Sequence, residues 1–211
     1  IDTDDPKDAD RFLGCVHRPH ETKSQEGKTI RWMEYDMEEF LVSCVEKYKE
    51  LAGKYGGKLR YVDTPFLDET VLTRPETNRK AEDGKEEPAG ELKPIAARIL
   101  MKILYAARVA RYDLLRITNL LAAYVTKWTA ACDKMLHRLV CYINSSLKYR
   151  MFSKVGDRIE DVNIALWSDA DFAGCQQTAR STSGVFFALS GPNTRFVLSA
   201  CSKRTRIRPS P

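Results

Sequence analysis

Along the first part of the chain, the pattern of apolar and polar residues predicts two short strands followed by a helix. Residues 12–17 and 29–35 have the β-type composition of strands, and the polar, glycine-containing stretch between them suits the loop of a hairpin. Asp36 then stands three residues before Glu39, which is a capping-box arrangement with Asp in place of Ser or Thr. The apolar residues that follow recur at helical spacing as far as Leu51.

The middle of the chain combines a polar segment with a long helical region. Residues 76–91 contain no large apolar residue, which is typical of a solvated linker. From Pro94 to about Tyr149 the chain is rich in Ala, Leu and Ile, and neither Gly nor Pro occurs after Pro94. This stretch predicts two or three packed helices, with breaks near 112–113 and 126–127.

Beyond Gly156 the pattern changes to short β-type runs. These runs occupy 162–168, 184–189 and 194–201, and turn-forming residues separate them. Three successive strands predict an antiparallel meander, and such a sheet needs a covering layer to bury one of its faces. No helical pattern that could supply this layer follows the third strand. Together with the preceding helices, the meander predicts the α+β fold class.

Composition and charge narrow the functional classes. The 211 residues carry a formal charge of +5 and 43% hydrophobic residues, which allows a sizeable core and only mildly favours a polyanionic partner. Six cysteines lie apart without a C-x-x-C pair, so we expect reduced thiols in a cytoplasmic or nuclear protein rather than a secreted disulfide scaffold. No apolar run reaches the roughly 18 residues of a membrane span. Because the chain begins at Ile1 without a signal-peptide pattern, we expect a piece of a longer protein.

Two carboxylates close the first strand of the predicted meander. Asp169 lies at the end of the strand and Asp171 follows two residues later, so both side chains face one side if the strand continues. In that arrangement they could approach a divalent cation. On pattern alone, an aspartate at a strand end is more often a turn or cap residue.

Three strings stand in order along this C-terminal part. They are Ser-Asp-Ala-Asp-Phe-Ala-Gly at 168–174, Arg-Ser-Thr-Ser-Gly at 180–184, and Phe-Val-Leu-Ser-Ala-Cys-Ser-Lys at 196–203. These strings resemble the opening of the RNase H domain in copia-type retrotransposon polyproteins. The resemblance implies an RNase H-like sheet in which Asp169 is the first metal-binding carboxylate and Asp171 a second candidate ligand. It also implies Mg²⁺, since RNase H chemistry uses two metal ions to activate water and stabilise the leaving oxygen.

The same resemblance predicts that part of the site is missing. In the family, a helix with a Glu and further Asp residues follow the third strand, whereas no acidic residue follows Asp171 here. One or two carboxylates cannot build a two-metal site. We therefore expect that this chain alone binds no Mg²⁺ and performs no hydrolysis, and that Asp169 is a remnant of the catalytic site.

Strings upstream of the meander are similar to the region between the polymerase palm and RNase H of the same polyproteins. In this region the family has an Arg-Pro-Asp string, and Tyr112 stands here in place of its proline. The paired aspartates of the polymerase site lie further upstream in the family, so that site is also expected to be missing. The similar strings are Phe-Leu-Gly at 12–14, Thr-Pro-Phe at 64–66, Ile-Leu-Tyr at 103–105, Arg-Tyr-Asp at 111–113 and the helical segment 137–149.

Basic residues dominate the helical region. Between residues 93 and 150 the only acids are Asp113 and Asp133. Such an imbalance indicates either an ordinary solvated helix surface or a surface that follows phosphates by neutralising their charge. The resemblance to a polymerase thumb and connection region favours the second interpretation, with RNA–DNA hybrid or duplex nucleic acid as the partner. The predicted nucleic-acid-binding residues are Lys127, Lys134, Arg138, Lys148 and Arg180.

The predicted organisation has four segments. They are 1–75, the end of a reverse transcriptase palm and thumb; 76–91, the linker; 92–155, a basic helical connection; and 156–211, an incomplete RNase H-like domain with three antiparallel strands. The predicted function is that of a reverse transcriptase/RNase H polyprotein fragment that is not catalytic alone and retains a nucleic-acid-binding surface. The alternative is a non-catalytic nucleic-acid-binding or structural subunit of a larger assembly derived from such an element, with other chains completing the fold. A decayed element copy is a third interpretation, and no membrane partner is expected.

Overall fold

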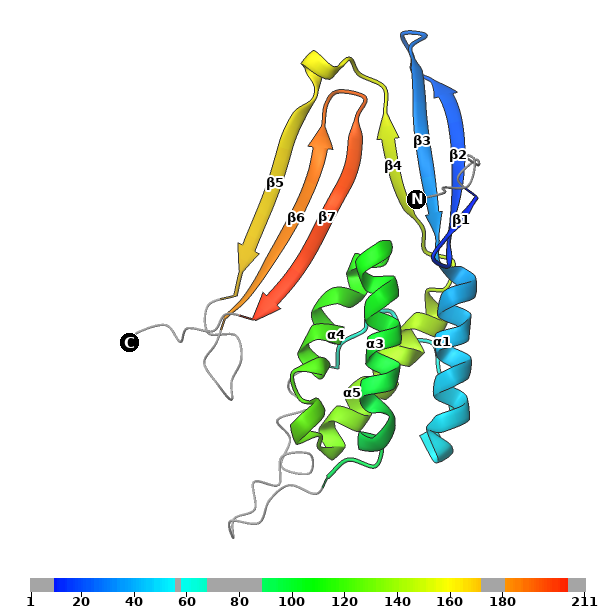
Figure 1. Cartoon of the computed structure of the whole chain (residues 1–211), viewed down its shortest axis with the longest axis vertical. Helices are drawn as coiled ribbons and strands as arrows, with labels where there is room; N and C mark the ends of the chain where they lie inside the picture. The colour runs from blue at the N-terminus through cyan, green and yellow to red at the C-terminus, as the bar shows by residue number, and fades with distance from the viewer. Residues whose placement is uncertain (1–9, 56–57, 68–88, 172–180, 205–211) are drawn as a thin grey trace, which may run out of the picture. The chain divides into compact units, whose positions relative to one another are not determined.

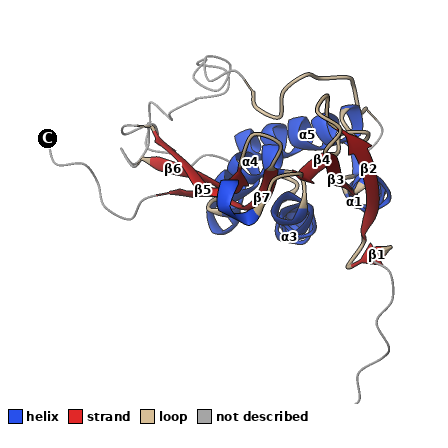
Figure 2. Cartoon of the chain, turned by 90° about the horizontal axis from the view of Figure 1, so that it is seen from above, coloured by secondary structure: helices blue, strands red, loops and turns tan. Residues whose placement is uncertain are grey.

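The computed structural model describes residues 10–55, 58–67, 89–171 and 181–204 (Figure 1). These residues form a mixed α+β structure, and the chain divides into two compact units. The helical unit is Glu38–Lys148, and the sheet unit combines Ile1–Met37 with Tyr149–Pro211. Figure 2 distinguishes the helices of the first unit from the strands of the second by colour. The chain therefore leaves the sheet after its N-terminal strands and returns to it only after the last helix.

Amphipathic helices build the helical unit: α1 (Glu38–Leu51), α3 (Lys93–Val109), α4 (Leu115–Ala122) and α5 (Ala130–Ser145). Pro94 stands in the first turn of α3, where its missing N–H removes no helical hydrogen bond. Helix α1 packs against α3 and α5, and α4 also packs against both, so the apolar stripes meet in one core. The largest fully buried side chains of this core are Leu41, Tyr48, Ile99, Leu100, Ile103, Leu114, Ile117, Leu121, Trp128, Leu136 and Leu139.

The helices predicted from the sequence are confirmed, and so are the breaks between them. The break expected near 112–113 is a 3₁₀ turn at Tyr112–Leu114, and the break expected near 126–127 is a second one at Val125–Lys127. Both turns interrupt apolar runs that contain neither Gly nor Pro. Packing against neighbouring helices therefore ends these helices, because their own residues carry no strong stop signal.

The buried side chain of Arg111 joins the first of these turns to the end of α5. Its guanidinium donates to both carboxylate oxygens of Asp113, at 2.9 and 2.7 Å, and to the carbonyl and hydroxyl oxygens of Ser146, at 3.0 and 2.8 Å. The hydroxyl of Tyr142 donates to the same carboxylate at 3.0 Å. Only 2% of Arg111 is exposed, so the Arg-Tyr-Asp string supplies an internal charge-assisted network and not a surface cation.

The C-terminal end of the predicted solvated linker is packed into the helical unit. Residues 76–88 lie outside the described part of the chain, whereas Gly90 is buried. The carboxylate of Asp133 accepts the backbone N–H groups of residues 91–92, at 2.7 and 3.0 Å, and Nε1 of Trp128, at 2.7 Å. A Cβ on Gly90 would lie 2.6 Å from that carboxylate, so the close approach requires a glycine. The end of this segment is therefore docked at Gly90, between the exposed residues Ala89 and Glu91, while the rest of the predicted linker lies outside the described residues.

Seven antiparallel strands form the sheet, in the order β1-β2-β3-β4-β7-β6-β5. The N-terminal hairpin and the C-terminal meander predicted from the sequence are both confirmed. The predicted strand 12–17 is interrupted by a turn at residues 13–14, which separates β1 from β2. Strand β2 then continues to Lys23 over polar residues that the prediction placed in the loop, and β3 extends one residue beyond the prediction. The strands outside β4 are β1 (Arg11–Phe12), β2 (Cys15–Lys23), β3 (Thr29–Asp36), β5 (Asn163–Ala170), β6 (Thr182–Ser190) and β7 (Arg195–Arg204).

Strand β4 (Met151–Val155) joins the hairpin to the meander and corrects the sequence prediction in two respects. The predicted helical segment 92–155 ends in this strand, and the three strands of the meander do not form a sheet of their own. Strand β4 pairs with β3 along its whole length and with β7 through Lys154 and Arg195. So short a strand is defined by partners that are distant in the sequence, and no local pattern reveals them.

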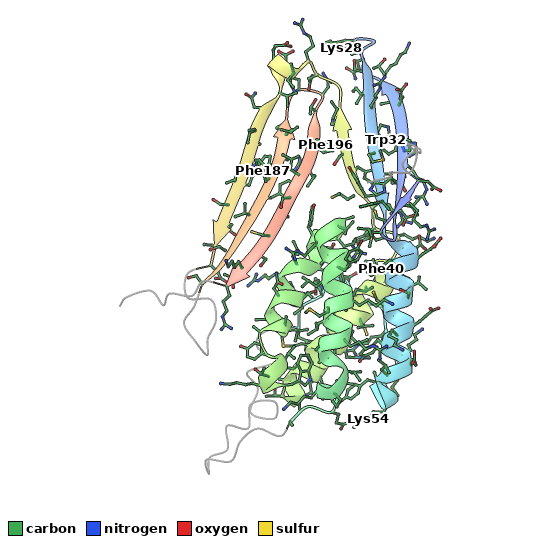
Figure 3. The ribbon with its side chains drawn as sticks, viewed as in Figure 1. Lys28, Trp32, Phe40, Lys54, Phe187 and Phe196 are labelled. Atoms are coloured by element: carbon green, nitrogen blue, oxygen red, sulfur yellow. The ribbon has the colours of Figure 1, made fainter. Side chains whose placement is uncertain are left out.

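Directly opposite residues of neighbouring strands point to the same face of a sheet, so the register assigns the side chains to two faces. Figure 3 labels Trp32, Phe187 and Phe196 on three of the strands. We define a Phe187 face, which is mainly apolar, by Met33, Val155, Leu166, Val185, Phe187, Leu189 and Phe196. We define a Trp167 face, which combines aromatic and charged side chains, by His20, Trp32, Phe152, Lys154, Trp167, Asp169, Phe186 and Arg195.

We expect Arg111→Met to lower the free energy of unfolding of the helical unit by about 3 kcal/mol, because removing one member of a buried charged pair leaves its partners uncompensated. The figure is at the low end of the usual range since the side chain of Asp113 is 34% exposed. Urea denaturation followed by the circular dichroism of the helices measures the loss. Arg108→Met, at an exposed position of α3, is the control and should change the value by less than about 0.5 kcal/mol. Equal losses in both variants would contradict the network.

Candidate nucleic-acid interface

The structure separates the two carboxylates at the end of β5. Asp169 is exposed on the Trp167 face, opposite Gly184 of β6. Strand β5 ends at Ala170, so the alternation that would bring Asp171 to the same side does not continue. Asp171 instead pairs with Thr182: its carboxylate accepts the backbone N–H of Thr182, and its own N–H donates to the Thr182 carbonyl at 3.1 Å. Asp171 therefore closes the ends of β5 and β6, whereas Asp169 faces solvent.

The geometry around these carboxylates bears on the predicted metal site. Two-metal chemistry draws its ligands from several elements of a fold. Within the ranges that the structure describes, no three His, Cys, Asp or Glu side chains come together in a group that could hold a metal ion. Asp169 as a metal ligand remains a prediction from the resemblance. Asp171 has a structural partner, and a metal would have to compete with it for the carboxylate.

The predicted nucleic-acid-binding residues differ in their surroundings. Lys127 in the turn before α5, Lys134 on α5 and Lys148 after α5 are exposed. Arg138 lies one turn after Lys134, but its guanidinium donates to the carbonyl oxygen and the hydroxyl oxygen of Thr64, at 2.9 and 3.1 Å. Arg138 therefore fastens the segment before the linker onto α5. A guanidinium has five N–H donors, so those that remain could still meet a phosphate.

Both acids of the helical region have partners within the helical unit, although Asp113 is itself exposed. Asp113 is bound by Arg111, and Asp133 is 1% exposed and accepts three hydrogen bonds. Within 93–148, a range that the structure describes throughout, these are the only carboxylates. From outside the range, Glu50 of α1 interacts with Arg98, whose charge helps Lys47 to lower the pKa of Glu50. Arg180, the fifth predicted contact, lies outside the described residues. The exposed cations of this range are Lys93, Arg98, Arg108, Arg116, Lys127, Lys134 and Lys148.

The Trp167 face carries a group of aromatic rings and cations that no sequence motif predicts. The rings of Trp32 and His20 stack with centroids 3.9 Å apart and planes 13° apart, and Phe152 meets Trp32 edge-on at 5.5 Å. On the meander, the guanidinium of Arg195 lies 5.9 Å from the centre of the Trp167 ring. These residues come from strands that are distant in the sequence. The alternation of apolar and polar residues within each strand is the only sequence signal, and it assigns the residues to one face only when the register is known.

Arginines hold the acids of the N-terminal part of this face. Arg18 donates to Glu34 and to Asp36, both at 2.8 Å, and Arg150 lies 3.2 Å from Asp36. The hydrogen bond to Asp36 raises the pKa of Arg18 above its ordinary value. Nε2 of His20 lies 3.5 Å from the Glu34 carboxylate, which is too long for a well-formed hydrogen bond. The two carboxylates of this cluster are thus compensated by two arginines.

A hollow of about 330 Å³ is lined by residues of β2, β3, β4 and β7. Its apolar lining includes Met33, Val155 and Phe196 of the Phe187 face, and the ion pair of Arg31 and Glu21, at 2.8 Å, is also part of the lining. Its size is at the lower end of ligand pockets in proteins. The charged groups of the lining neutralise each other, so the hollow presents apolar contacts and no arrangement for acid–base or nucleophilic chemistry.

We expect the removal of Asp171 and the removal of Asp169 to have different effects on the stability of the sheet unit. Asp171→Ala should lower the free energy of unfolding of the sheet unit by about 1–2 kcal/mol, because the Thr182 N–H loses its charged acceptor. Asp169→Ala should change it by less than about 0.5 kcal/mol, because the side chain is exposed. Chemical denaturation followed by Trp fluorescence measures both values. A larger loss for Asp169→Ala would show that Asp169, and not Asp171, is the structural residue.

Among the described helices, none is both long enough and apolar enough for a transmembrane span. Comparison with protein-family models, with curated protein sequences and with solved structures gives no match.

Proposed function

We propose that the chain is a nucleic-acid-binding protein derived from a copia-type reverse transcriptase/RNase H polyprotein. In this proposal its helical unit binds RNA–DNA hybrid or duplex nucleic acid without sequence preference. One observation carries the proposal: residues 93–148 expose seven cations, while both of their acids are engaged by internal partners. An ordinary solvated helix surface mixes both signs of charge, whereas on the surface of this range seven cations stand against one exposed acid, Asp113, whose carboxylate is paired with Arg111.

Counterion release is the physical basis of such binding. Each cation that neutralises a phosphate frees a condensed counterion, and the gain does not depend on base sequence. Helix α5 has 16 residues and is about 24 Å long at 1.5 Å per residue, with Lys134 near its start and Lys148 just beyond its end. Duplex DNA carries a charge about every 1.7 Å along its axis, so cations over this span meet several phosphates.

The meander supports the derivation from an RNase H-containing polyprotein. Strands β5, β6 and β7 pair in chain order, and the exposed Asp169 stands at the end of β5, where the resemblance expects the first metal-binding carboxylate. The described residues do not fit the two Mg²⁺ ions of the family, because Asp171 is bonded to Thr182 and no group of three acidic or imidazole ligands forms among them. The proposed activity of this chain is therefore binding.

A structural role in a larger assembly is the alternative, and the sheet unit gives it one specific observation. The Phe187 face and the residues beside it expose large apolar side chains, among them Ile164 at 73%, Leu166 at 62% and Leu198 at 43%. Exposed apolar surface of this kind is typical of a face that another protein element covers. In this alternative the sheet, and not the cations of the helical unit, is the functional surface.

We expect the purified chain to bind a labelled RNA–DNA hybrid with an affinity that falls steeply with salt. Lys134→Glu should weaken binding by about 10-fold at low salt, because it removes one phosphate contact and adds a repulsive charge. Lys134→Ala, which removes the charge without adding a repulsive one, should reduce the slope of log affinity against log salt concentration by about 1. Fluorescence anisotropy at two or more salt concentrations measures both effects, with hybrids of different sequence giving the same values.

Lys49→Glu is the matched control, since Lys49 is an exposed lysine of α1 in the same unit but outside residues 93–148. It should change the affinity by less than two-fold. Absence of hybrid binding at low salt, binding that does not respond to salt, or an equal loss in Lys49→Glu would contradict the proposal.

A further inference from the structure

A line of polar and aromatic side chains crosses the Trp167 face from one side of the sheet to the other. Each member lies directly opposite the next on the neighbouring strand, so all of them point to the same side. The line passes through six strands and joins residues from both ends of the chain. In spatial order its members are His20, Trp32, Lys154, Arg195, Ser190 and Asn163.

Two exposed aromatic rings lie on the same side of this line. Phe152 is two residues before Lys154 on β4 and is 53% exposed, and Trp167 on β5 is 48% exposed. Such exposure is high for aromatic side chains, which are usually largely buried. Among the described rings, Phe152 meets Trp32 edge-on with centroids 5.5 Å apart, and Trp167 lies tilted to Phe186 with centroids 5.7 Å apart, at interplanar angles of 60° and 50°. Neither aromatic contact is a parallel stack that would cover a whole ring face, and the Arg195 guanidinium lies over the Trp167 ring, 5.9 Å from its centroid.

The two cations of the line, beside these rings, have no carboxylate partner among the described residues. Lys154 and Arg195 are both exposed and stand directly opposite each other across β4 and β7. The acids Glu34 and Asp36 of this face are compensated by arginines, and Asp169 lies at the far end of β5. The centre of the face is therefore positively charged and flanked by aromatic rings.

We propose that the Trp167 face binds single-stranded nucleic acid, with bases stacked on Phe152 and Trp167 and with the backbone phosphates between them on Lys154 and Arg195. Single strands are the ligand that this chemistry recognises, because their bases are free to stack and their backbone requires cations close to the stacked bases. A duplex keeps its bases stacked on one another and could not use the rings. The proposal goes beyond the proposed function, since it concerns the sheet unit and not the helical unit.

A protein partner fits this face less well than it fits the Phe187 face. Lys is depleted in the centre of protein interfaces, where charged groups have to be desolvated. Here Lys154 lies at the centre, next to Arg195, and the phosphates of a polyanion would compensate both charges. The Phe187 face, which has mainly apolar side chains, remains the better site for a protein element.

The test uses the whole chain and fluorescein-labelled single strands of about 12 nucleotides, oligo(dT) and oligo(U), a length within the range of single-strand sites. Trp167→Leu, which keeps apolar packing but removes the ring, and Phe152→Ala should each weaken binding by about 10-fold. Lys154→Ala and Arg195→Ala should each reduce the slope of log affinity against log salt by about 0.7. Circular dichroism confirms that each variant is folded.

Matched controls come from the opposite face of the same strands. Leu166→Ala removes a side chain that is 62% exposed next to Trp167, and Lys203→Ala removes an exposed cation of β7 on the Phe187 face. Both should bind the single strands within two-fold of the unchanged chain. Equal losses in Leu166→Ala, or unchanged binding in both Trp167→Leu and Phe152→Ala, would overturn the proposal.

Intrinsic fluorescence provides a measurement that can be made first on the unchanged chain. The chain has three tryptophans, of which Trp128 is 2% exposed and cannot stack on a base. Unlabelled oligo(dT) should quench the emission of the unchanged chain, and Trp167→Leu should remove most of the quenching. An emission that does not change at saturating oligonucleotide would overturn the proposal, as would sedimentation of the chain as a dimer that the same variants convert to a monomer.

Failure of this proposal is distinguishable from failure of the proposed function. Lys134→Glu should weaken hybrid binding and leave oligo(dT) binding within two-fold, while Trp167→Leu should do the reverse. If one set of variants weakens both ligands equally, both surfaces belong to one site and the assignment of single strands to the Trp167 face is wrong.

Discussion

The pairing of strand β4 with β3 on one side and with β7 on the other determines the architecture of this chain. The backbone N–H and C=O groups of a strand need partners on its neighbours, and β4 is the only described strand that the hairpin and the meander share. Its five residues, Met151–Val155, bring strands from the two ends of the chain into one sheet, and the helical unit is inserted between β3 and β4. Both faces of the sheet, and the line of side chains across the Trp167 face, depend on this register.

Polar side chains support the β4–β7 junction, where regular pairing is limited to Lys154 and Arg195. The buried hydroxyl of Ser153 accepts the backbone N–H of Val197 at 3.2 Å, and the buried hydroxyl of Thr194 accepts the N–H groups of residues 156–157, both at 3.2 Å. Burial by itself raises the pKa of Asp157, but hydrogen bonds from Thr194 and Asn193 outweigh it and leave that pKa below its usual value. The junction therefore depends on a few specific hydrogen bonds, since there is no long ladder between the two strands.

Another polar contact at this junction explains a glycine. A Cβ on Gly191 would lie 2.6 Å from the Asp157 carboxylate, which also accepts the N–H of Asn193 at 2.7 Å. The Gly-Pro-Asn turn before β7 thus has a structural reason that the turn pattern alone does not give. Its conformation sets where β7 begins, and so places Arg195 opposite Lys154.

Local patterns were sufficient for the elements whose signal lies within their own residues. The hairpin, the helices, the breaks near 112–113 and 126–127, and the three strands of the meander all follow from periodicity and turn residues. Local patterns could not predict the features that depend on a partner distant in the sequence. Strand β4 has no local sequence signal of its own. From the sequence, Arg111 and Arg138 could both be surface cations. The structure shows that Arg111 donates to Asp113 and Ser146 and that Arg138 donates to Thr64.

The residues of the candidate site also divide into those that the sequence predicts and those that only the structure shows. Asp169 was found through a sequence string, and its exposure at the end of β5 agrees with a residue that does not hold the fold together. The role of Asp171 depends on where β5 stops, which its own sequence does not determine, and the Trp167 face depends on register between strands far apart in the chain. The imbalance of charge in 93–148 is visible in the sequence, but only the structure shows that Asp133 is buried with three donors and that Asp113 is paired with Arg111.

Backbone hydrogen exchange, measured by mass spectrometry with and without nucleic acid, tests the central claim that two units bind two forms of nucleic acid. The account predicts that oligo(dT) slows exchange in peptides covering 151–155 and 195–204, and that an RNA–DNA hybrid slows exchange in peptides covering 127–148. Peptides of α1 should not respond to either ligand and serve as the internal reference. The same set of protected peptides with both ligands, or protection confined to the helical unit with oligo(dT), would contradict the account.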